Sequence, residues 1–313
     1  NASRGLGVGP WRSFFKIAFP MALPALITGI SLMCMEVMNE LGTFALLNIP
    51  SISTGIAENW IIEGNPKSAI GLSLVALLII FTLIIFEKFS RRKSKRWSEN
   101  PASKDSQGWE LKKTRALLAI TISLFPPIFS FGIPCFWVLL NIDQIQKGLS
   151  IELLTLSFRT ISLGFFTALI TMLFSLIISL ARRPNKSLLL GIITNLAGIG
   201  YAIPGTVLAL SLISISSSRF NFIAICLLIW GYLVRFLTIS KGSIDSSLER
   251  ISPSLDEAAL GLGEDWLGII KRIHLPLLQG PIFVGSLLVF VDTIKELPIT
   301  FILRPFDFDT LSV

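Results

Sequence analysis

Four acidic residues stand in two long segments that are otherwise almost free of charge. Glu36 and Glu40 lie four positions apart in the first segment, with Asn39 between them, and Asp292 and Glu296 repeat this spacing in the second. Residues four apart share one face of a helix, and carboxylate oxygens are the ligands that hard metal cations prefer. The pattern predicts two matching acidic faces that could line a cation pathway.

A structural role is the alternative for these acids. Lys295 and Arg235 occur in the same apolar regions and are available to neutralise them. No set of metal ligands is otherwise evident, so the identity of any metal stays unknown. Cys34, Cys135 and Cys226 are scattered without paired spacing, which favours packing residues over a disulfide or a metal site.

The elements that must position these residues are membrane spans. Of the 313 residues, 52% are apolar and 15% are charged, whereas roughly 25% charged residues are usual in soluble chains. A helical span needs about 20 apolar residues. Seven stretches approach or exceed that length: 21–46, 69–86, 116–140, 160–181, 188–213, 221–239 and 277–299. We therefore expect an all-α polytopic bundle, with kinks or breaks at internal proline and glycine, as near 198–205.

Basic residues are distributed unevenly between the loops. One set of loops holds the basic run 88–115 and the pair Arg182 and Arg183, and the opposite set holds few lysines and arginines. Cytoplasmic loops carry such an excess, so the first set is predicted to be cytoplasmic and the four acids lie toward the outer side. The net charge of +7 reflects this bias, and no nucleic-acid partner is expected.

The two ends of the chain resemble each other after a shift of 256 residues. Glu36 falls on Asp292 and Glu40 falls on Glu296 without a gap. Such self-similarity indicates a duplicated architecture, and transporters often place their pathway between two such halves. We expect the end of a first half over residues 1–86, a cytoplasmic linker over 87–115 and a second half over 116–313. The chain has no initiator Met, so we expect an excerpt that lacks the last span.

The loop over residues 240–276, called the coupling loop below, carries the most specific pattern. It reads Glu257-Ala258-Ala259, three residues, Gly263, nine residues, and Ile273-His274-Leu275-Pro276. Small alanines allow a short helix to lie in a groove of a partner, and Gly263 allows a sharp turn. Proline suits the first turn of the next span. An ordinary amphipathic loop helix is the alternative.

The same spacing occurs near the start of the chain. Its counterparts are Ala2, Gly7, Ile17 and Pro20, with Asn1 at the position of the glutamate. No G-x-x-x-x-G-K loop followed by Ser or Thr is present, and the single histidine, His274, has no evident catalytic partner. We therefore expect neither an enzymatic activity nor a cofactor bound by this chain.

The coupling loop is similar to the EAA loop of binding-protein-dependent ABC importer permeases, whose pattern E-A-A-x3-G-x9-I-x-L-P it matches at every fixed position. The resemblance implies a type I ABC importer permease with an internal repeat. It implies that the loop docks on a separate ATPase, where Glu257 makes an ionic contact. The partners implied are a homodimer of ATPase subunits that bind ATP and Mg²⁺, a periplasmic substrate-binding protein, and the lipid of the bacterial inner membrane.

Residues 35–43 and 292–311 resemble ferric-iron permeases, which carry two fused halves in one chain. This likeness implies ferric iron as the substrate, with the acids and Asn39 near its pathway. Thiamine and phosphonate permeases share parts of the pattern and stay open as alternatives. A passive channel or a polytopic membrane enzyme is the alternative from a different class, although a channel needs no such loop.

Overall fold

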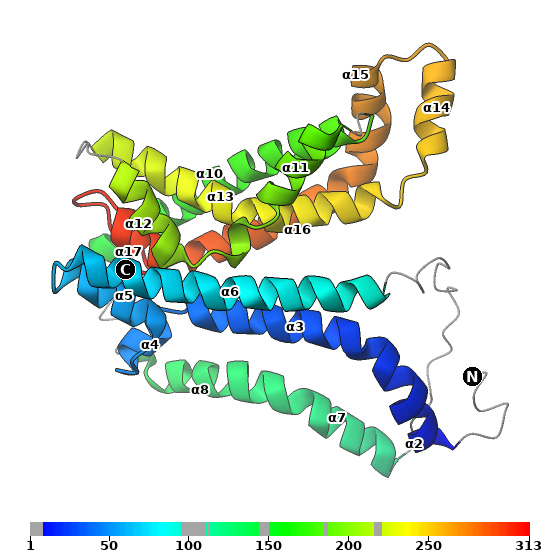
Figure 1. Ribbon diagram of the computed structural model, residues 1–313. Helices are drawn as coiled ribbons and strands as arrows, with labels where there is room; N and C mark the ends of the chain where they lie inside the picture. The colour runs from blue at the N-terminus through cyan, green and yellow to red at the C-terminus, as the bar shows by residue number, and fades with distance from the viewer. Residues whose placement is uncertain (1–8, 95–110, 112, 144–149, 185–186, 216–220) are drawn as a thin grey trace. The chain divides into compact units, whose positions relative to one another are not determined.

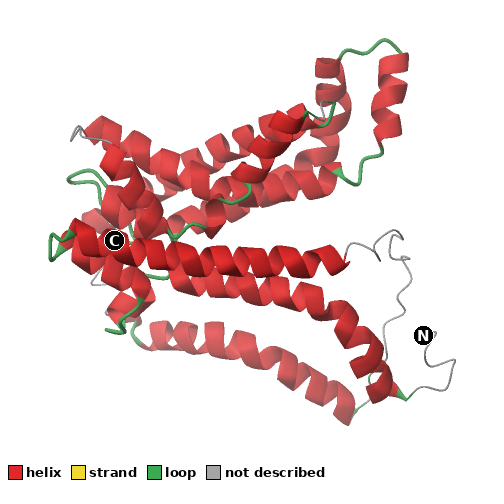
Figure 2. Cartoon of the chain, in the orientation of Figure 1, coloured by secondary structure: helices red, strands yellow, loops and turns green. Residues whose placement is uncertain are grey.

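The computed structural model describes residues 9–94, 111, 113–143, 150–184, 187–215 and 221–313. These residues form helices and loops and contain no strand, which confirms the all-α prediction (Figure 2). The chain forms two compact units: residues 1–94 with 158–313, called unit 1, and residues 95–157, called unit 2. Most of the predicted linker, 87–115, lies outside the described residues.

Unit 1 contains all the elements that carry the predicted site (Figure 1). Its first part comprises α2 (Pro10–Ser13), the π-helical turn η1 (Phe14–Ala18), α3 (Phe19–Asn39), α4 (Gly42–Leu46), α5 (Ile52–Ile61) and α6 (Pro66–Ser94). Its second part comprises most of α10 (Ile151–Arg182), then α11 (Leu188–Ala197), η4 (Gly200–Ala202), α12 (Gly205–Ile215), α13 (Asn221–Leu248), α14 (Pro253–Gly261), α15 (Trp266–Ile269), η5 (Ile270–His274), α16 (Leu275–Ile294) and α17 (Pro298–Leu303). Unit 2 contains α7 (Thr114–Pro127), η3 (Ile128–Gly132) and α8 (Ile133–Leu140).

The described residues include five helices long and apolar enough to cross a membrane: Pro66–Phe86, Thr114–Leu140, Ile151–Arg182, Ile223–Leu248 and Trp266–Ile294. A sixth crossing results if the pair Leu188–Ala202 and Gly205–Ile215, bent by 113°, counts as one span. These six correspond to six of the seven predicted spans. Helix α3 lies where the seventh, 21–46, was predicted. Several predicted ends were wrong. Helices α3 and α16 stop earlier than predicted, at Asn39 and Ile294, whereas α10 begins earlier, at Ile151. Helix α13 continues to Leu248, so the first nine residues of the predicted coupling loop are helical.

The internal repeat is visible in the backbone. The elements α2, η1 and α3 start at positions 10, 14 and 19, and α15, η5 and α16 start 256 residues later, at 266, 270 and 275. Each π-helical turn closes with a bond five residues back, from the Phe19 N–H to the Phe14 carbonyl and from the Leu275 N–H to the Ile270 carbonyl. The next residue in both copies is proline, whose ring clashes with the carbonyl four residues before it. The wider π turn gives that ring room at the start of both spans.

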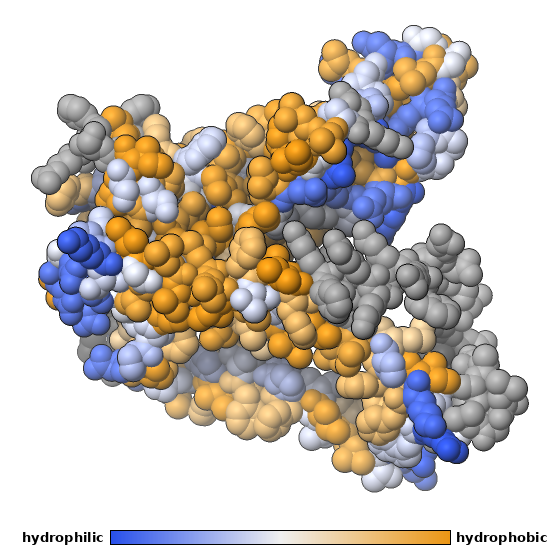
Figure 3. Space-filling model, viewed as in Figure 1, coloured by the Kyte–Doolittle hydropathy of each residue, from blue (hydrophilic) through white to orange (hydrophobic). Residues whose placement is uncertain are grey.

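Helix α13 forms the centre of unit 1. It packs against α16, α12, α17 and η4, and its Tyr232 and Phe236 side chains are fully buried. The Tyr232 hydroxyl lies 2.5 Å from the Thr300 hydroxyl of α17. Figure 3 shows hydrophobic side chains over the middle of unit 1 and hydrophilic ones toward its ends, one of which carries α14 and α15. This distribution is that expected of spans with a lipid-facing surface.

Candidate functional site

Three helix termini, called the helix breaks below, lie close together beside α13. Helix α3 ends at Asn39, α16 ends at Ile294, and α12 begins at Gly205 after the sharp bend. Helix ends leave backbone N–H and C=O groups without partners inside the helix, so a buried end needs side chains to satisfy them. The polar residues singled out in the sequence gather at these ends.

Arg235 of α13 lies at the centre of this group. Its Nη1 atom donates to the Asn39 Oδ1 atom at 2.8 Å and to the Glu296 Oε1 atom at 3.2 Å. The Asn39 oxygen also accepts the Gly205 backbone N–H at 2.6 Å. All three side chains are buried, with Arg235 only 2% exposed. We call Asn39, Gly205, Arg235 and Glu296 the break cluster, in which hydrogen bonds to Asn39 join the first repeat to the buried Arg235–Glu296 ion pair of the second.

The close packing around Gly205 leaves no room for a side chain at this position. A Cβ atom at this position would lie 2.4 Å from the Arg235 Nη1 atom and 2.7 Å from the Glu296 Oε1 atom. Only a residue without a side chain allows the backbone of α12 to approach the ion pair this closely. The proline–glycine step predicted as a kink therefore also makes the N-terminus of α12 available to Asn39.

A second group, the outer acid cluster, lies next to the first. The Lys295 ammonium is 3.3 Å from the Glu36 Oε1 atom and 3.0 Å from the Asp292 Oδ1 atom. The Tyr201 hydroxyl donates to the Glu36 Oε2 atom at 2.8 Å. The Arg235 guanidinium lies 5.8 Å from the centre of the Tyr201 ring. Glu36 and Asp292, which occupy equivalent positions in the two repeats, therefore both form an ion pair with Lys295.

The expectation that each acidic pair shares a helix face was wrong. Glu40 has an extended backbone, with ψ of 123°, and Glu296 follows the end of α16. The Glu40 Oε1 atom accepts the Thr43 N–H at 2.9 Å, and the Glu296 Oε1 atom accepts the Ile299 N–H at 3.3 Å. Each acid therefore caps the short helix that follows its break. Satisfying those N–H groups favours the end of the span over its continuation.

Metal-ligand candidates are few. The described residues contain no group of three or more His, Cys, Asp or Glu side chains placed to hold a metal ion. The cysteines Cys34, Cys135 and Cys226 are free thiols. They are exposed on the chain rather than packed within it, contrary to the packing role predicted for them.

The coupling loop folds into a short helix between two spans. Helix α14 begins after Ser252 and ends in a turn at Gly263, whose φ of +86° favours glycine. Glu257 and Ala258 are exposed, whereas Ala259 is buried. Ile273 and Leu275 are half-buried and Pro276 is exposed in the first turn of α16. Of the first-repeat counterparts, Ile17 and Pro20 are exposed and Ala2 and Gly7 lie outside the described residues.

Arg183 and Asp256 were missed by reasoning from the sequence. The Arg183 Nε atom lies 2.5 Å from the Asp256 Oδ2 atom, and its other nitrogens donate to the carbonyls of Leu248, Ile251 and Ser252. The sequence showed Arg183 only as one of two basic residues after a span. Nothing local predicts that its partner stands 73 positions later.

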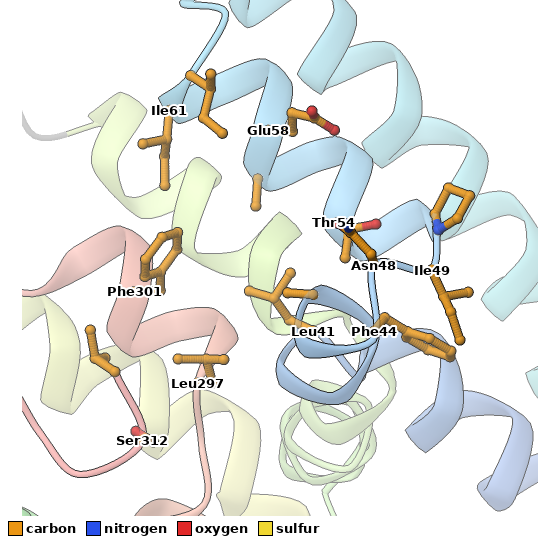
Figure 4. A pocket seen from close by; sticks show the side chains of 15 residues that line it. Leu41, Phe44, Asn48, Ile49, Thr54, Glu58, Ile61, Leu297, Phe301 and Ser312 are labelled. Atoms are coloured by element: carbon orange, nitrogen blue, oxygen red, sulfur yellow. The ribbon is translucent and has the colours of Figure 1, made fainter.

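A pocket of about 440 Å³ lies beside α4, α5 and α17 (Figure 4), at the end of unit 1 opposite α14 (Figure 1). It is bounded by α4, α5, α17 and the last residues of the chain, and its wall is mostly apolar. Leu41, Phe44, Leu297 and Phe301 line it together with Glu58. None of the carboxylates in the break cluster or the outer acid cluster lines this pocket.

The amino-acid sequence is similar to those of known transport proteins. Residues 1–95 match the family described as binding-protein-dependent transport system inner membrane component. The whole chain is 26% identical, over 323 aligned residues, to the Fe(3+)-transport system permease protein FbpB 2 of Haemophilus influenzae. The chain spans 63% of the length of that relative. Residues 1–95 are therefore similar to the inner-membrane components of binding-protein-dependent transport systems, and the described residues contain five helices long and apolar enough to cross a membrane.

Proposed function

We propose that the chain forms part of the permease of an ATP-binding-cassette importer that moves ferric iron inward. The observation that carries the importer is the coupling loop, in which an exposed short helix with Glu257 stands between two spans. The likeness to an Fe(3+)-transport permease supports iron. A homodimer of ATPase subunits, holding ATP and Mg²⁺, would supply the energy, and a periplasmic binding protein would deliver the substrate.

Helices α13 and α16 connect α14 to the break cluster. Helix α14 is joined directly to α13 and is joined through α15 and η5 to α16. A rigid helix transmits a displacement along its length, and α13 carries Arg235 about 20 Å before its end at Leu248. Helix α16 ends beside Glu296. A push on α14 by the closing ATPase would therefore reach the break cluster through two spans.

We place the cation pathway beside the outer acid cluster. Glu296 and Asn39 are occupied by Arg235, and Glu40 is occupied as a helix cap. Among the described residues, Glu36 contacts Lys295 and Tyr201, and Asp292 contacts Lys295. Their oxygens suit a hard cation once the lysine moves away. Within the predicted pathway set, these two acids are the ones that we expect to meet iron.

The importer proposal predicts that reversing the charge of Glu257 prevents productive docking. Glu257→Arg should reduce co-purification of the ATPase subunit with the full-length permease about tenfold or more, because an exposed contact becomes repulsive at an interface. Glu249→Arg is the matched control, since it changes an exposed glutamate at the same end but outside α14. Absence of any ATPase association with the unaltered permease would rule out the importer.

The substrate proposal predicts loss of iron uptake without loss of protein. In cells that regain the full-length gene, Glu36→Gln with Asp292→Asn should lower uptake of labelled ferric iron about tenfold at normal protein level, because two charged ligands become neutral. Labelled thiamine and phosphonate are measured in parallel. Uptake of either instead of iron by the unaltered protein would replace iron as the substrate, and unchanged iron uptake in the variant would assign both acids a structural role.

A further inference from the structure

The guanidinium of Arg183 connects α10 to the coupling loop at four points. It bonds Asp256 of α14, the Leu248 carbonyl at the end of α13 (2.8 Å), and the Ile251 and Ser252 carbonyls between the two helices (3.0 and 3.4 Å). The Arg183 and Asp256 side chains are only 14% and 12% exposed. Exposed ion pairs contribute little, but a mostly buried arginine that satisfies several acceptors holds its partners in one geometry.

Asp256 also faces the start of α16. Its Oδ1 atom lies 3.2 Å from the Nε2 atom of His274, the last residue of the π turn η5. The angles do not make a hydrogen bond, and both atoms are buried without one. The fully buried imidazole packs 5.7 Å from the Trp266 ring, measured between ring centres. Asp256 is thus enclosed between Arg183 on one side and the beginning of α16 on the other.

Helix α10 also makes contacts at its opposite end. The Arg159 Nη1 atom donates to the Asp307 carbonyl at 2.8 Å, and the Thr160 hydroxyl accepts the Leu311 N–H at 2.9 Å. These partners lie in the segment after α17. Between the two ends, the Ser175 hydroxyl contacts the Ser240 hydroxyl of α13.

Small residues also bring α10 close to α16. A Cβ atom at Gly164 would lie 3.0 Å from the Phe290 ring, and one at Gly285 would lie 2.7 Å from the Met172 side chain. Glycine therefore permits close packing at two levels along these spans. Helix α10 is therefore in contact with the coupling loop, with the spans α13 and α16, and with the segment after α17.

We infer that Arg183 is a positioning residue that makes α10 a third element moved by the coupling loop, besides the two spans joined to it by the chain. This inference rests on the proposed importer function. When the ATPase displaces α14, the Arg183–Asp256 link carries α10 with it, and α10 passes the movement to the segment around Asp307 and Leu311. Without the link, α14 still docks, but the movement reaches the outer end through α13 and α16 only.

The test uses the complete transporter in proteoliposomes, with the full-length permease, its ATPase and its binding protein, and labelled ferric iron as the probe. The quantity measured is the iron transported per ATP hydrolysed. Arg183→Ala should lower this ratio about tenfold, while the ATPase still co-purifies in the normal amount, because charge-assisted bonds within the loop are lost rather than the docking face. Arg183→Lys, which keeps the charge but not the planar fork, should give an intermediate ratio.

Arg182→Ala is the matched control, since Arg182 has the same charge and instead bonds the Thr194 hydroxyl of α11 at 3.0 Å. It should leave the ratio within about twofold of the unaltered value. If Arg183→Ala fails to accumulate, Arg183→Lys decides by the same ratio. A ratio equal to that of the control overturns the inference, whereas an unaltered transporter without ATP-driven uptake overturns the importer proposal itself.

Discussion

Replacing Arg235 by methionine is expected to destabilise the folded protein by about 3–5 kcal/mol, which is the usual cost of removing one partner from a buried ion pair. The side chain is 2% exposed and its Nη1 atom bonds both Asn39 and Glu296. Without the guanidinium, the Glu296 carboxylate is left buried and uncompensated, and one bond that joins the end of α3 to α13 is lost. The measurement is the thermal unfolding midpoint of the purified protein, with its amount in the membrane.

The control for this prediction is a double variant. Glu296→Gln keeps an amide oxygen that can accept the Ile299 N–H while removing the charge. Arg235→Met with Glu296→Gln should therefore recover most of the stability lost by Arg235→Met alone, since contacting residues are energetically coupled. If the single and double variants unfold at the same temperature, the ion pair is not what holds the three breaks together.

Replacing Gly200 by alanine is expected to have the second-largest effect. A Cβ atom there would lie 1.8 Å from the carbonyl oxygen of Val234 and 2.9 Å from its carbonyl carbon. Backbone atoms of a buried helix cannot move aside as a flexible side chain can, so η4 must separate from α13. Overpacking of this kind usually costs about 1–3 kcal/mol and sometimes more.

The displacement should also reach the outer acid cluster. Tyr201 follows Gly200, and its backbone N–H bonds the Thr238 hydroxyl of α13 at 3.3 Å while its own hydroxyl bonds Glu36. We expect Gly200→Ala to lower both the unfolding midpoint and substrate uptake per folded molecule. Gly191→Ala is the control, because Gly191 lies inside α11 with nothing within 4 Å of an added Cβ. Alanine is the better helix former there, so equal losses in both variants would contradict the steric explanation.

The features that depend on local composition could be predicted from the amino-acid sequence alone. Long uncharged stretches predicted the helices, because lipid leaves no partner for backbone groups outside a helix. The shift of 256 residues predicted a repeat, which recurs in the start of each matched element. Gly263 was predicted as a turn, and its positive φ confirms it. In each case the physical cause lies within a few neighbouring residues or in the solvent around them.

The partners of the polar residues could not be predicted in this way, because they depend on how the helices pack. Spacing predicted two acids on one helix face, but Glu40 and Glu296 leave their helices because each satisfies the N–H groups of the helix that follows. Arg235 was one of two possible counter-ions, and packing against Gly205 directs it to Glu296 and Asn39. Arg183 finds its acceptors far along the chain for the same reason. A buried charge binds whichever opposite charge folding brings within reach, and that choice depends on helix packing rather than on neighbours in sequence.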